Sequence, residues 1–393
     1  MITVAAALDH LFGLVAPLEI EDVPLTAASG RVLARPMVAL SDQPPFAASA
    51  MDGYAVRAAD ARPGASLQLA GQSAAGRRAD HFLAPGHAIR IFTGAPLPDG
   101  ADCVIIQEDV TAKAGRITLG PAAEPSPGAN IRPPGNDFRA GATLGAPRRL
   151  TPADIALLAA MHHSRVPVFR QPQVALIATG DELVTPGDEP GPDQIAASNS
   201  YGLHALLTAL GARPRLLPIA RDTLPSLDQA FALAGDADLI VTIGGASVGD
   251  HDLVARAAAR AGMEPAFHKV AMRPGKPLLA GRLQGTALLG LPGNPVSAMV
   301  CGHVFLAPMI RVMSGLPAAP TPRRTATLAA ALPANGPREH YLRARHQDGR
   351  VAAFLRQDSS LLTLLSQADC LIVQPPSDPG RPAGAPVEII DLP

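Results

Sequence analysis

Carboxylates gather in two short segments that each follow an apolar run of the sequence. Asp181 and Glu182 come just after the run VALIAT, and Asp250 and Asp252 come a few residues after the run LIVTI. Proteins usually hold Mg²⁺ with carboxylate oxygens beside a phosphate site, and water and substrate complete its coordination. Asp250 and Asp252 could instead cap the helix that follows them. The same alternative applies to Asp222, which precedes a different predicted helix.

The glycine-rich stretch GGASVG, residues 244–249, lies between the run LIVTI and the carboxylates Asp250 and Asp252. Glycines let the backbone amides of such a loop approach a ligand closely, and the helix that follows presents an N-terminus that favours anions. The alternative is a tight turn between a strand and a helix, with no ligand. The stretch lacks the Gly-Lys-Ser/Thr ending of a P-loop and the spacing of a dinucleotide-binding fingerprint, so both of those motifs are excluded.

Three cations lie close together in the segment FHKVAMRPGKP: Lys269, Arg273 and Lys276. A Pro-Gly turn would direct Arg273 and Lys276 towards the ligand edge, which makes a compact cation pair suited to an oxyanion. Solvated surface side chains are the alternative for such residues. Because the segment is otherwise apolar and bracketed by prolines, we favour a functional role.

The tetrapeptide Pro292-Gly293-Asn294-Pro295 follows the third apolar run, TALLGL. Its two prolines fix the backbone, and Gly293 leaves room beside it. Ser297 enters the first turn of the next helix, where hydroxyls and free amides meet anions. A structural helix start explains one proline but not the whole tetrapeptide, so we predict a binding loop.

The elements that position these loops are strands and helices in alternation. The three apolar runs, at 174–179, 239–243 and 286–291, contain β-branched residues, and each leads through glycine into a helical stretch. Buried runs joined by helices are typical of a parallel sheet covered on both faces. Such sheets bind ligands beyond the carboxyl ends of their strands, so the loops are predicted to converge. The predicted helices cover residues 199–210, 224–234, 253–261 and 296–313.

The rest of the chain predicts three further domains around a central α/β domain at 171–317, so the fold class is α/β multidomain. Residues 41–137 hold short apolar runs between turn residues, typical of an inserted β-rich module, and residues 318–393 resemble a small β-barrel. An N-terminal elongated helical or linker domain is predicted for 1–40 plus 138–170. Its expected helices run from Val4 to Val15, around Ala27 to Ala34, and from Thr151 onwards.

Composition excludes several classes of protein. The chain has 393 residues, 47% of them hydrophobic, and a formal net charge of −1, so no global field draws it to nucleic acid or an acidic membrane. Aromatic residues are only 3% with no Trp, which argues against stacking platforms for single-stranded nucleic acid. The three cysteines are far apart, so neither a disulfide framework nor a CxxC metal site is predicted.

The sequence also shows no targeting pattern. The start of the chain lacks the features of a signal peptide, and no apolar run reaches the roughly 18 residues that span a bilayer. We therefore expect a soluble cytoplasmic protein with no membrane or nucleic-acid partner.

Six ordered segments resemble one family along essentially the whole chain: SAMDGYAV, RIFTGAPLP, TGDEL, GGASVGDHD, RPGKP and LPGNPVSA. They are similar to the molybdopterin molybdenumtransferase family, which includes MoeA and the E domain of gephyrin. The resemblance implies a homodimer of elongated four-domain protomers with a central molybdopterin-binding domain. It also implies insertion of molybdate into adenylylated molybdopterin, release of AMP, and a need for a divalent cation such as Mg²⁺.

The resemblance implies a role for each motif. The acids would surround the nucleotide phosphate, with Glu182 and Asp252 as metal ligands, and the cations would hold oxyanions, molybdate among them. The proline loop would shape the pterin side of the cleft. The implied catalytic residues are Asp52, Glu182, Asp222, Asp252, Lys269 and Lys276. The implied substrate-binding residues are Thr93, Asp137, Thr179, Gly180, Asp181, Gly244, Gly245, Ser247, Gly249, Arg273, Pro292, Gly293, Asn294, Pro295, Ser297 and Arg343.

Three of these residues belong to the β-rich module. By composition alone, Asp52 is a turn residue and Thr93 ends a strand. In the family's dimer, the β-rich module of one protomer lies over the sheet edge of the other, so the resemblance implies that Asp52, Thr93 and Asp137 complete the site in trans. Because the substrate's dithiolene sulfurs bind the metal, the protein needs no cysteine cluster, and its task is positioning and electrostatics.

Two departures from the family pattern and two alternative functions accompany this interpretation. Ala47 and Ala48 stand where relatives often have a polar pair, and this change either weakens the contact in trans or marks a specialised paralogue. Arg273 replaces a common Lys and changes the donor geometry.

The alternative functions are a molybdopterin adenylyltransferase, which shares the central loops on a single compact domain, and a non-catalytic cofactor carrier or scaffold. Expected partners are a second copy of the chain, other molybdenum cofactor synthesis proteins and apo-molybdoenzymes.

Overall fold

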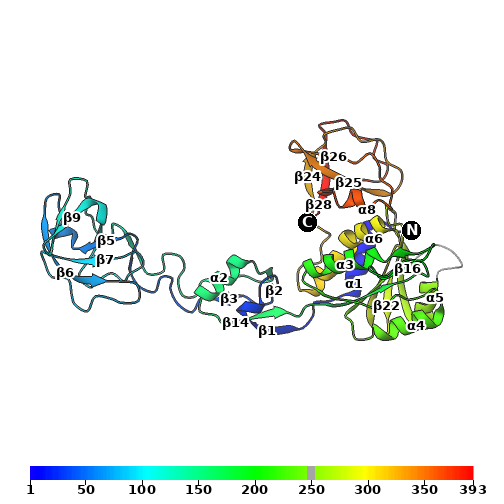
Figure 1. Cartoon of the computed structure of the whole chain (residues 1–393), viewed down its shortest axis with the longest axis horizontal. Coiled ribbons are helices and arrows are strands. Elements are labelled where there is room, and N and C mark those ends of the chain that lie inside the picture. Colours follow the sequence, from blue (N-terminus) through cyan, green and yellow to red (C-terminus); the bar gives the residue numbers. More distant parts are fainter. Residues whose placement is uncertain (246–252, 393) are drawn as a thin grey trace.

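The protein is an elongated molecule, described by a computed structural model over residues 1–245 and 253–392 (Figure 1). A β-rich module lies at one end, and a small sheet with one helix lies in the middle. The central α/β domain lies at the other end, beside the C-terminal barrel. The β-rich module and the central domain are therefore far apart within one chain, although both chain termini lie near the central domain (Figure 1).

The central sheet has the strand order β18-β15-β19-β23-β22-β20, and the first four strands are parallel. Val174 and Leu176 of β15 pack into one hydrophobic cluster, whereas Ala175 and Ile177 pack into another on the opposite face. Burial on both faces is why these strands are continuous apolar runs. The strands are β15 (Gln173–Ala178), β18 (Arg213–Leu216), β19 (Leu239–Ile243), β20 (Met263–Lys269), β22 (Pro277–Leu283) and β23 (Thr286–Leu291).

β22 pairs antiparallel with both of its neighbours, β23 and β20, so the sheet is mixed where the sequence predicted a parallel one. β22 turns into β23 through Gln284 and Gly285, which have φ values of 50° and 88°. Positive φ at both positions gives the two-residue turn that matches the twist of a hairpin. The segment LLAGRLQGTALLGL thus encodes two strands, and the prediction recognised only the second.

Helices cover both faces of this sheet. α4 (Leu224–Leu233) and α5 (Leu253–Arg260) pack on one face, and the other face carries α3 (Ser198–Ala209) and the segment Pro295–Met313. That segment consists of α6 (Pro295–Cys301), a π turn (Gly302–Leu306) and α7 (Ala307–Met313). Its length and mean hydropathy of 1.6 would suit a membrane span, but 83% of it is buried inside the protein, as in a core helix.

The first helix, α1 (Val4–Leu14), belongs to the central domain, which corrects its predicted place in the N-terminal domain. Val4, Ala7, Leu8 and Leu11 are buried in the cluster that also holds β15 and α7. These positions form a helical stripe, and such a stripe shows that a face is buried but not which surface covers it.

The middle domain is mainly β, although the sequence predicted it as helical. Its sheet has the order β1-β14-β2-β13, and the predicted helix at 27–34 is wrong. Gly30 turns the chain at φ 75°, and the buried Val32 and Leu33 then form β2. The elements are β1 (Ile20–Pro24), a 3₁₀ turn (Leu25–Ala27), β2 (Val32–Leu33), β13 (Arg148–Arg149), β14 (Arg165–Phe169) and α2 (Pro152–Ala160), which Thr151 caps with Asp154.

The β-rich module is a six-stranded sheet of order β8-β5-β7-β6-β10-β9, joined to the middle domain by two short strand pairs. Its strands are β5 (Gly53–Val56), β6 (Ser66–Ser73), β7 (His87–Ile91), β8 (Cys103–Ile106), β9 (Val110–Lys113) and β10 (Arg116–Leu119). The pairs are β3 (Met37–Val38) with β12 (Thr143–Leu144) and β4 (Ala48–Ser49) with β11 (Ile131–Arg132).

The C-terminal domain closes into the predicted small barrel, because a bridge between Leu328 and Val351 joins its outer strands. It is tied to the central domain by β21 (Met272–Arg273), which pairs with the start of β25 (Glu339–Gln347), where Arg273 lies opposite His340. The remaining elements are β24 (Arg324–Thr327), β25 (Glu339–Gln347), β26 (Arg350–Ala353), α8 (Leu362–Leu365), β27 (Cys370–Gln374) and β28 (Pro386–Asp391).

His340 lies in a positively charged junction between these two domains. Burial, followed by the guanidinium groups of Arg273, Arg338 and Arg343, lowers the pKa of this histidine to about 4 from its usual 6.5. The ring is therefore neutral in the folded protein at pH values where an exposed histidine would already be charged.

The placement of α1 is tested by comparing two buried leucines. Leu11→Ala is expected to destabilise the central domain by about 2–5 kcal/mol, because it leaves a cavity beneath α1. Hydrogen exchange should speed up in peptides from β20 and β22. Leu158→Ala is the matched control and should act on the middle domain instead. Faster exchange in the middle domain of the Leu11 variant would contradict the placement.

The junction at His340 predicts a pH dependence of stability. As the pH falls from about 6.5 towards 4, the unfolded chain takes up a proton on His340 that the folded chain excludes, so the free energy of unfolding decreases. His340→Gln should remove up to about 3 kcal/mol of this decrease. Denaturant unfolding of both proteins at pH 7 and pH 4.5 measures this decrease in the free energy of unfolding. An equal decrease in the original protein and the variant would refute the effect.

Candidate active site

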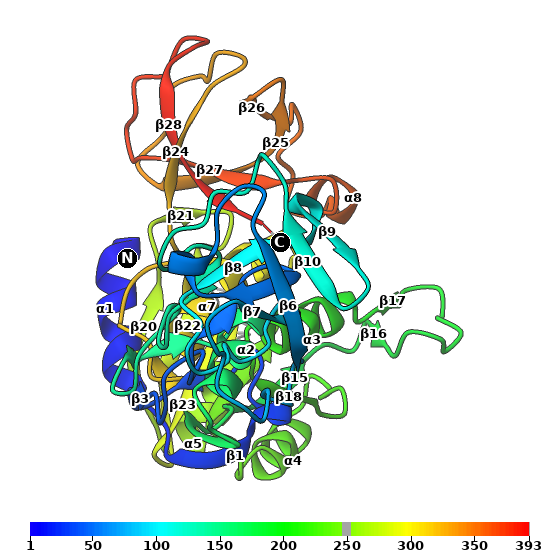
Figure 2. The same cartoon turned by 90° about the vertical axis from the view of Figure 1, so that its left-hand side faces the viewer.

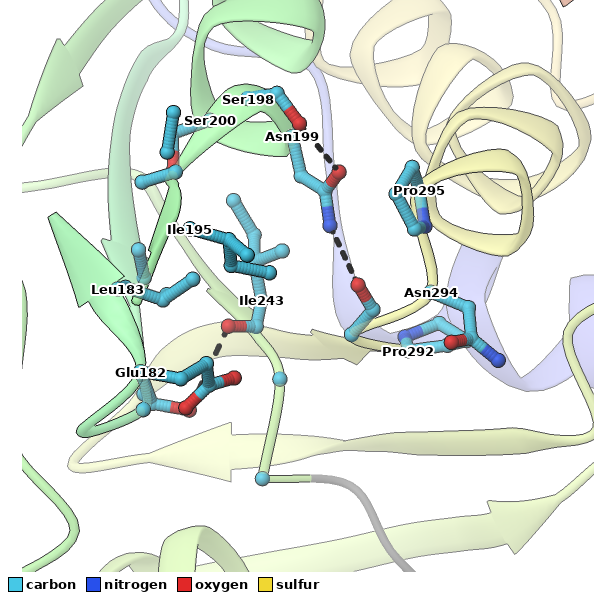
Figure 3. Close-up of a pocket in the computed structure, with 18 of the residues that line it drawn as sticks. Glu182, Leu183, Ile195, Ser198, Asn199, Ser200, Ile243, Pro292, Asn294 and Pro295 are labelled. Carbon is cyan, nitrogen blue, oxygen red and sulfur yellow. Dashed lines mark hydrogen bonds between the residues drawn. The ribbon is translucent and has the colours of Figure 1, made fainter. Parts of the chain in front are cut away.

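A cleft of about 880 Å³ lies beyond the carboxyl ends of β15, β19 and β23 (Figure 3). The loops that follow these three strands converge there, as the sequence predicted. Predicted site residues on its surface are Thr179, Gly180, Glu182, Asp222, Gly244, Gly245, Pro292, Gly293, Asn294 and Pro295.

Two glycines of this cleft are required by close approaches. At Gly180, with φ 146°, a Cβ would lie 2.3 Å from a carboxylate oxygen of Glu182. At Gly244, with φ 96°, a Cβ would lie 2.7 Å from the carbonyl oxygen of Thr179. A side chain at Gly180 would push aside the carboxylate of Glu182, and one at Gly244 would collide with the backbone of Thr179; the positive φ also disfavours a side chain at either position.

Acidic side chains form one wall of the cleft. The backbone N–H of Asp222 donates to Asp181 Oδ1 at 3.2 Å, and both Asp222 and Glu182 line the cleft. Burial, together with the charges of Asp181 and Glu182, raises the pKa of Asp222. The capping alternative for Asp222 is excluded, because Thr223 caps α4 through a bond from Ser226 N.

This wall suits Mg²⁺, which proteins typically bind through one or two carboxylates while substrate phosphates and water supply the other ligands. Within 1–245 and 253–392, no group of three or more His, Cys, Asp or Glu could hold a metal ion on its own. The predicted residues Ser247, Gly249 and Asp252, and Asp250 beside them, lie outside the described residues.

The opposite wall was not predicted and comes from the start of α3. Ser198, Asn199 and Ser200 line the cleft, and Asn199 Nδ2 donates to the carbonyl oxygen of Gly293 at 2.7 Å (Figure 3). The segment before α3 forms β16 (Leu183–Val184) and β17 (Ile195–Ala196), which project from the central domain (Figure 2). The run Ser-Asn-Ser at a helix start near this sheet edge was the available signal.

The predicted cations flank the cleft without lining it. Lys269, Arg273 and Lys276 are exposed, and Lys276 precedes Pro277, which does line the cleft. Arg343 is only 1% exposed, and its Nε donates to Gln357 Oε1 at 3.3 Å. None of these four cations forms an ion pair with a carboxylate in the described part of the chain.

The C-terminal domain also contributes to the cleft. Ser360 is on the cleft surface, and the N–H of Val296 in α6 donates to the carbonyl oxygen of Ser359 at 3.0 Å. This bond holds the C-terminal domain against the proline loop. Ser297, by contrast, is 4% exposed within α6 and does not line the cleft.

The predicted residues of the β-rich module form a separate cluster. Asp52 Oδ1 accepts bonds from Thr93 N at 2.7 Å and Thr93 Oγ1 at 2.8 Å, which lowers the pKa of this carboxyl. Asp137 lines a nearby hollow of about 590 Å³ with Arg132 and Phe46. Because the module lies at the far end of the molecule (Figure 1), one chain does not bring these residues to the cleft.

Family profiles match nearly the whole chain. Residues 2–161 match the MoeA N-terminal region (domain I and II), residues 175–312 match a "probable molybdopterin binding domain", and residues 325–392 match the MoeA C-terminal region (domain IV).

Curated relatives and solved structures agree with these profiles. Molybdopterin molybdenumtransferase 2 of Mycobacterium tuberculosis is 38% identical over 385 residues, which cover 94% of each chain. Molybdopterin molybdenumtransferase of a Nostoc species is 40% identical over 306 residues, 75% of this chain and 70% of its own. The MoeA crystal structures of Pyrococcus horikoshii superpose with TM-scores of 0.82 and 0.84 at 30% and 27% identity, and they cover the whole of this chain and at least 99% of their own. The chain belongs to the molybdopterin molybdenumtransferase (MoeA) family, the transferases of molybdenum cofactor biosynthesis.

Proposed function

We propose that the chain inserts molybdate into adenylylated molybdopterin, releasing AMP and forming molybdenum cofactor. The observation that carries this proposal is the cleft at the sheet edge, where Glu182 and Asp222 meet the proline loop. Its volume of about 880 Å³ is within the range of sites that enclose a drug-sized ligand or cofactor. Adenylyltransferase and scaffold functions are not favoured, since the full-length relatives are named molybdenumtransferases.

Mg²⁺ is the cofactor that the acidic wall favours. Bound there, it would supply Lewis acidity and a template for the phosphate linkage that is broken. Glu182 and Asp222 would hold it, and the raised pKa of Asp222 is consistent with this role, because a cation relieves the burial and charge repulsion that cause the shift. Asp181 would orient Asp222 through its backbone N–H.

The oxyanion would be held by the flanking cations. Arg273, Lys276 and Arg343 form no ion pair among the described residues, although Asp358 lies near enough to Arg343 to raise its pKa. Their charge would be available for molybdate. Arg343 is nearly fully buried, and burial, only partly offset by Asp358, lowers its pKa. Fixed positive groups of this kind stabilise an anion without reorganising around it.

We further propose a homodimer in which each site is completed in trans. The cluster of Asp52 and Thr93, and the hollow beside Asp137, present polar groups that the chain's own cleft cannot reach (Figure 1). A second copy placed antiparallel to the first, about a two-fold axis, would bring its module over the cleft and complete both sites equally. We also place the protein in the cytoplasm, in exchange with other cofactor synthesis proteins and apo-molybdoenzymes.

The acidic wall is tested by Glu182→Gln. Loss of the charge should lower molybdate-dependent AMP release by at least about a hundredfold, because the variant keeps the shape of the side chain but not its affinity for a cation. Asp188→Asn, on the exposed part of the same loop, is the matched control and should retain activity. Release within threefold of the original, measured with purified adenylylated molybdopterin, would overturn the role of Glu182.

The site in trans is tested by mixing two inactive variants. Asp52→Asn and Glu182→Gln should each be inactive, but a mixed dimer contains one site with both original residues. Random exchange of protomers should therefore restore roughly a quarter of the original AMP release. Co-expression with two affinity tags allows the mixed dimer to be isolated and assayed. No recovery in the isolated mixed dimer would contradict a shared site.

A further inference from the structure

The start of α3 has no side-chain cap. Side chains of Thr3, Thr151 and Thr223 cap α1, α2 and α4, whereas α3, which begins after Ala197, has none, and neither do α6, α7 and α8. The first N–H groups of a helix have no partner within it and carry its positive end. In α3 this end opens onto the cleft, because residues 196–200 all line it.

Ser200 provides a second, independent observation at this place. It is 5% exposed and lines the cleft, and its Oγ has no hydrogen-bond partner in the part of the chain that the structure describes. An unpartnered buried hydroxyl costs free energy, so native proteins rarely keep one without a use. A ligand oxygen at the start of α3 would supply the missing partner.

The two neighbouring side chains complete the arrangement. Asn199 is already occupied, since its Nδ2 bond to Gly293 fixes the start of α3 to the proline loop. Ser198 is exposed at the mouth, with only a long contact of 3.5 Å from its Oγ to Asn199 Oδ1 (Figure 3). The hydroxyls of Ser198 and Ser200 therefore flank the free N–H groups and are available as donors.

We propose that the N-terminus of α3, with Ser198 and Ser200, is the subsite that holds the diphosphate group of the adenylylated substrate. The acidic wall accounts for a cation but not for the anion that must accompany it. A helix N-terminus with adjacent hydroxyls suits phosphate oxygens. This assignment rests on the proposed function, and it divides the cleft into a cation wall at Glu182 and Asp222 and an anion wall at α3.

A charge placed at Ser198 tests the anion wall. Ser198→Asp places a negative charge at the positive end of the helix dipole, which is a favourable interaction, so the protein should stay folded. The same charge repels phosphate. Calorimetric titration should show ADP affinity at least about tenfold weaker, with the affinity for adenosine unchanged. Ser198→Asn has the same shape without the charge and should bind ADP within about threefold of the original. Equal ADP affinities in the Asp and Asn variants would overturn the proposal.

A second pair of variants separates binding from structure. Ser200→Ala removes a hydroxyl that lacks a partner in the free protein, so Tm should be equal or higher while ADP affinity falls about tenfold. Thr242→Val is the matched control, because Thr242 Oγ1 is also buried without a described partner but does not line the cleft. It should leave ADP affinity unchanged. A lower Tm with unchanged ADP affinity for Ser200→Ala would make Ser200 structural.

The two levels of the proposal fail separately. If the original protein releases AMP in the presence of molybdate but its ADP affinity ignores these substitutions, the subsite is wrong and the transferase stands. If ADP binding responds as expected and no AMP is released, the subsite stands and the transferase activity is wrong.

Discussion

The parallel pairing of β15, β19 and β23 is the constraint on which the site depends. Ala178 pairs with Ile243, and Ile243 pairs with Leu291, so the three strands end at the same level of the sheet. Each loop therefore starts beside its neighbours, although more than a hundred residues of sequence separate the first from the last. Burial of these strands on both faces fixes their register, since a slip would move polar ends into the core.

The acidic wall of the cleft and the domain junction each collect ionisable groups of one charge sign. Asp222 has a raised pKa because it is buried beside Asp181 and Glu182, and His340 has a lowered one because it is buried beside arginines of the domain junction. Had the acids and cations paired with each other, neither set would be available to a ligand. The pairing of β21 with β25 keeps Arg273 on the side of the C-terminal domain, away from the acids that line the cleft.

Local patterns in the sequence were sufficient for most elements of the fold. Strand-forming runs, the cap at Thr151 and the glycine-rich turns could be predicted because each depends on residues close together in the chain. The errors arose where tertiary contacts decide. The stripe of α1 does not reveal that the central domain covers it, and the apolar residues Val32 and Leu33 fit a short helix as well as the strand that burial against β14 selects.

The same limit applies to the site. Three of its loops were predictable, because strand ends and glycines place them at one edge. The run Ser-Asn-Ser marked the start of α3, but its significance lies in an unpartnered hydroxyl, which is a property of packing rather than of residue type. Serine at a helix start ordinarily satisfies the helix itself. Here Ala197 stands at the capping position, Asn199 is bound to Gly293, and the hydroxyl of Ser200 inside the first turn is left to meet a ligand.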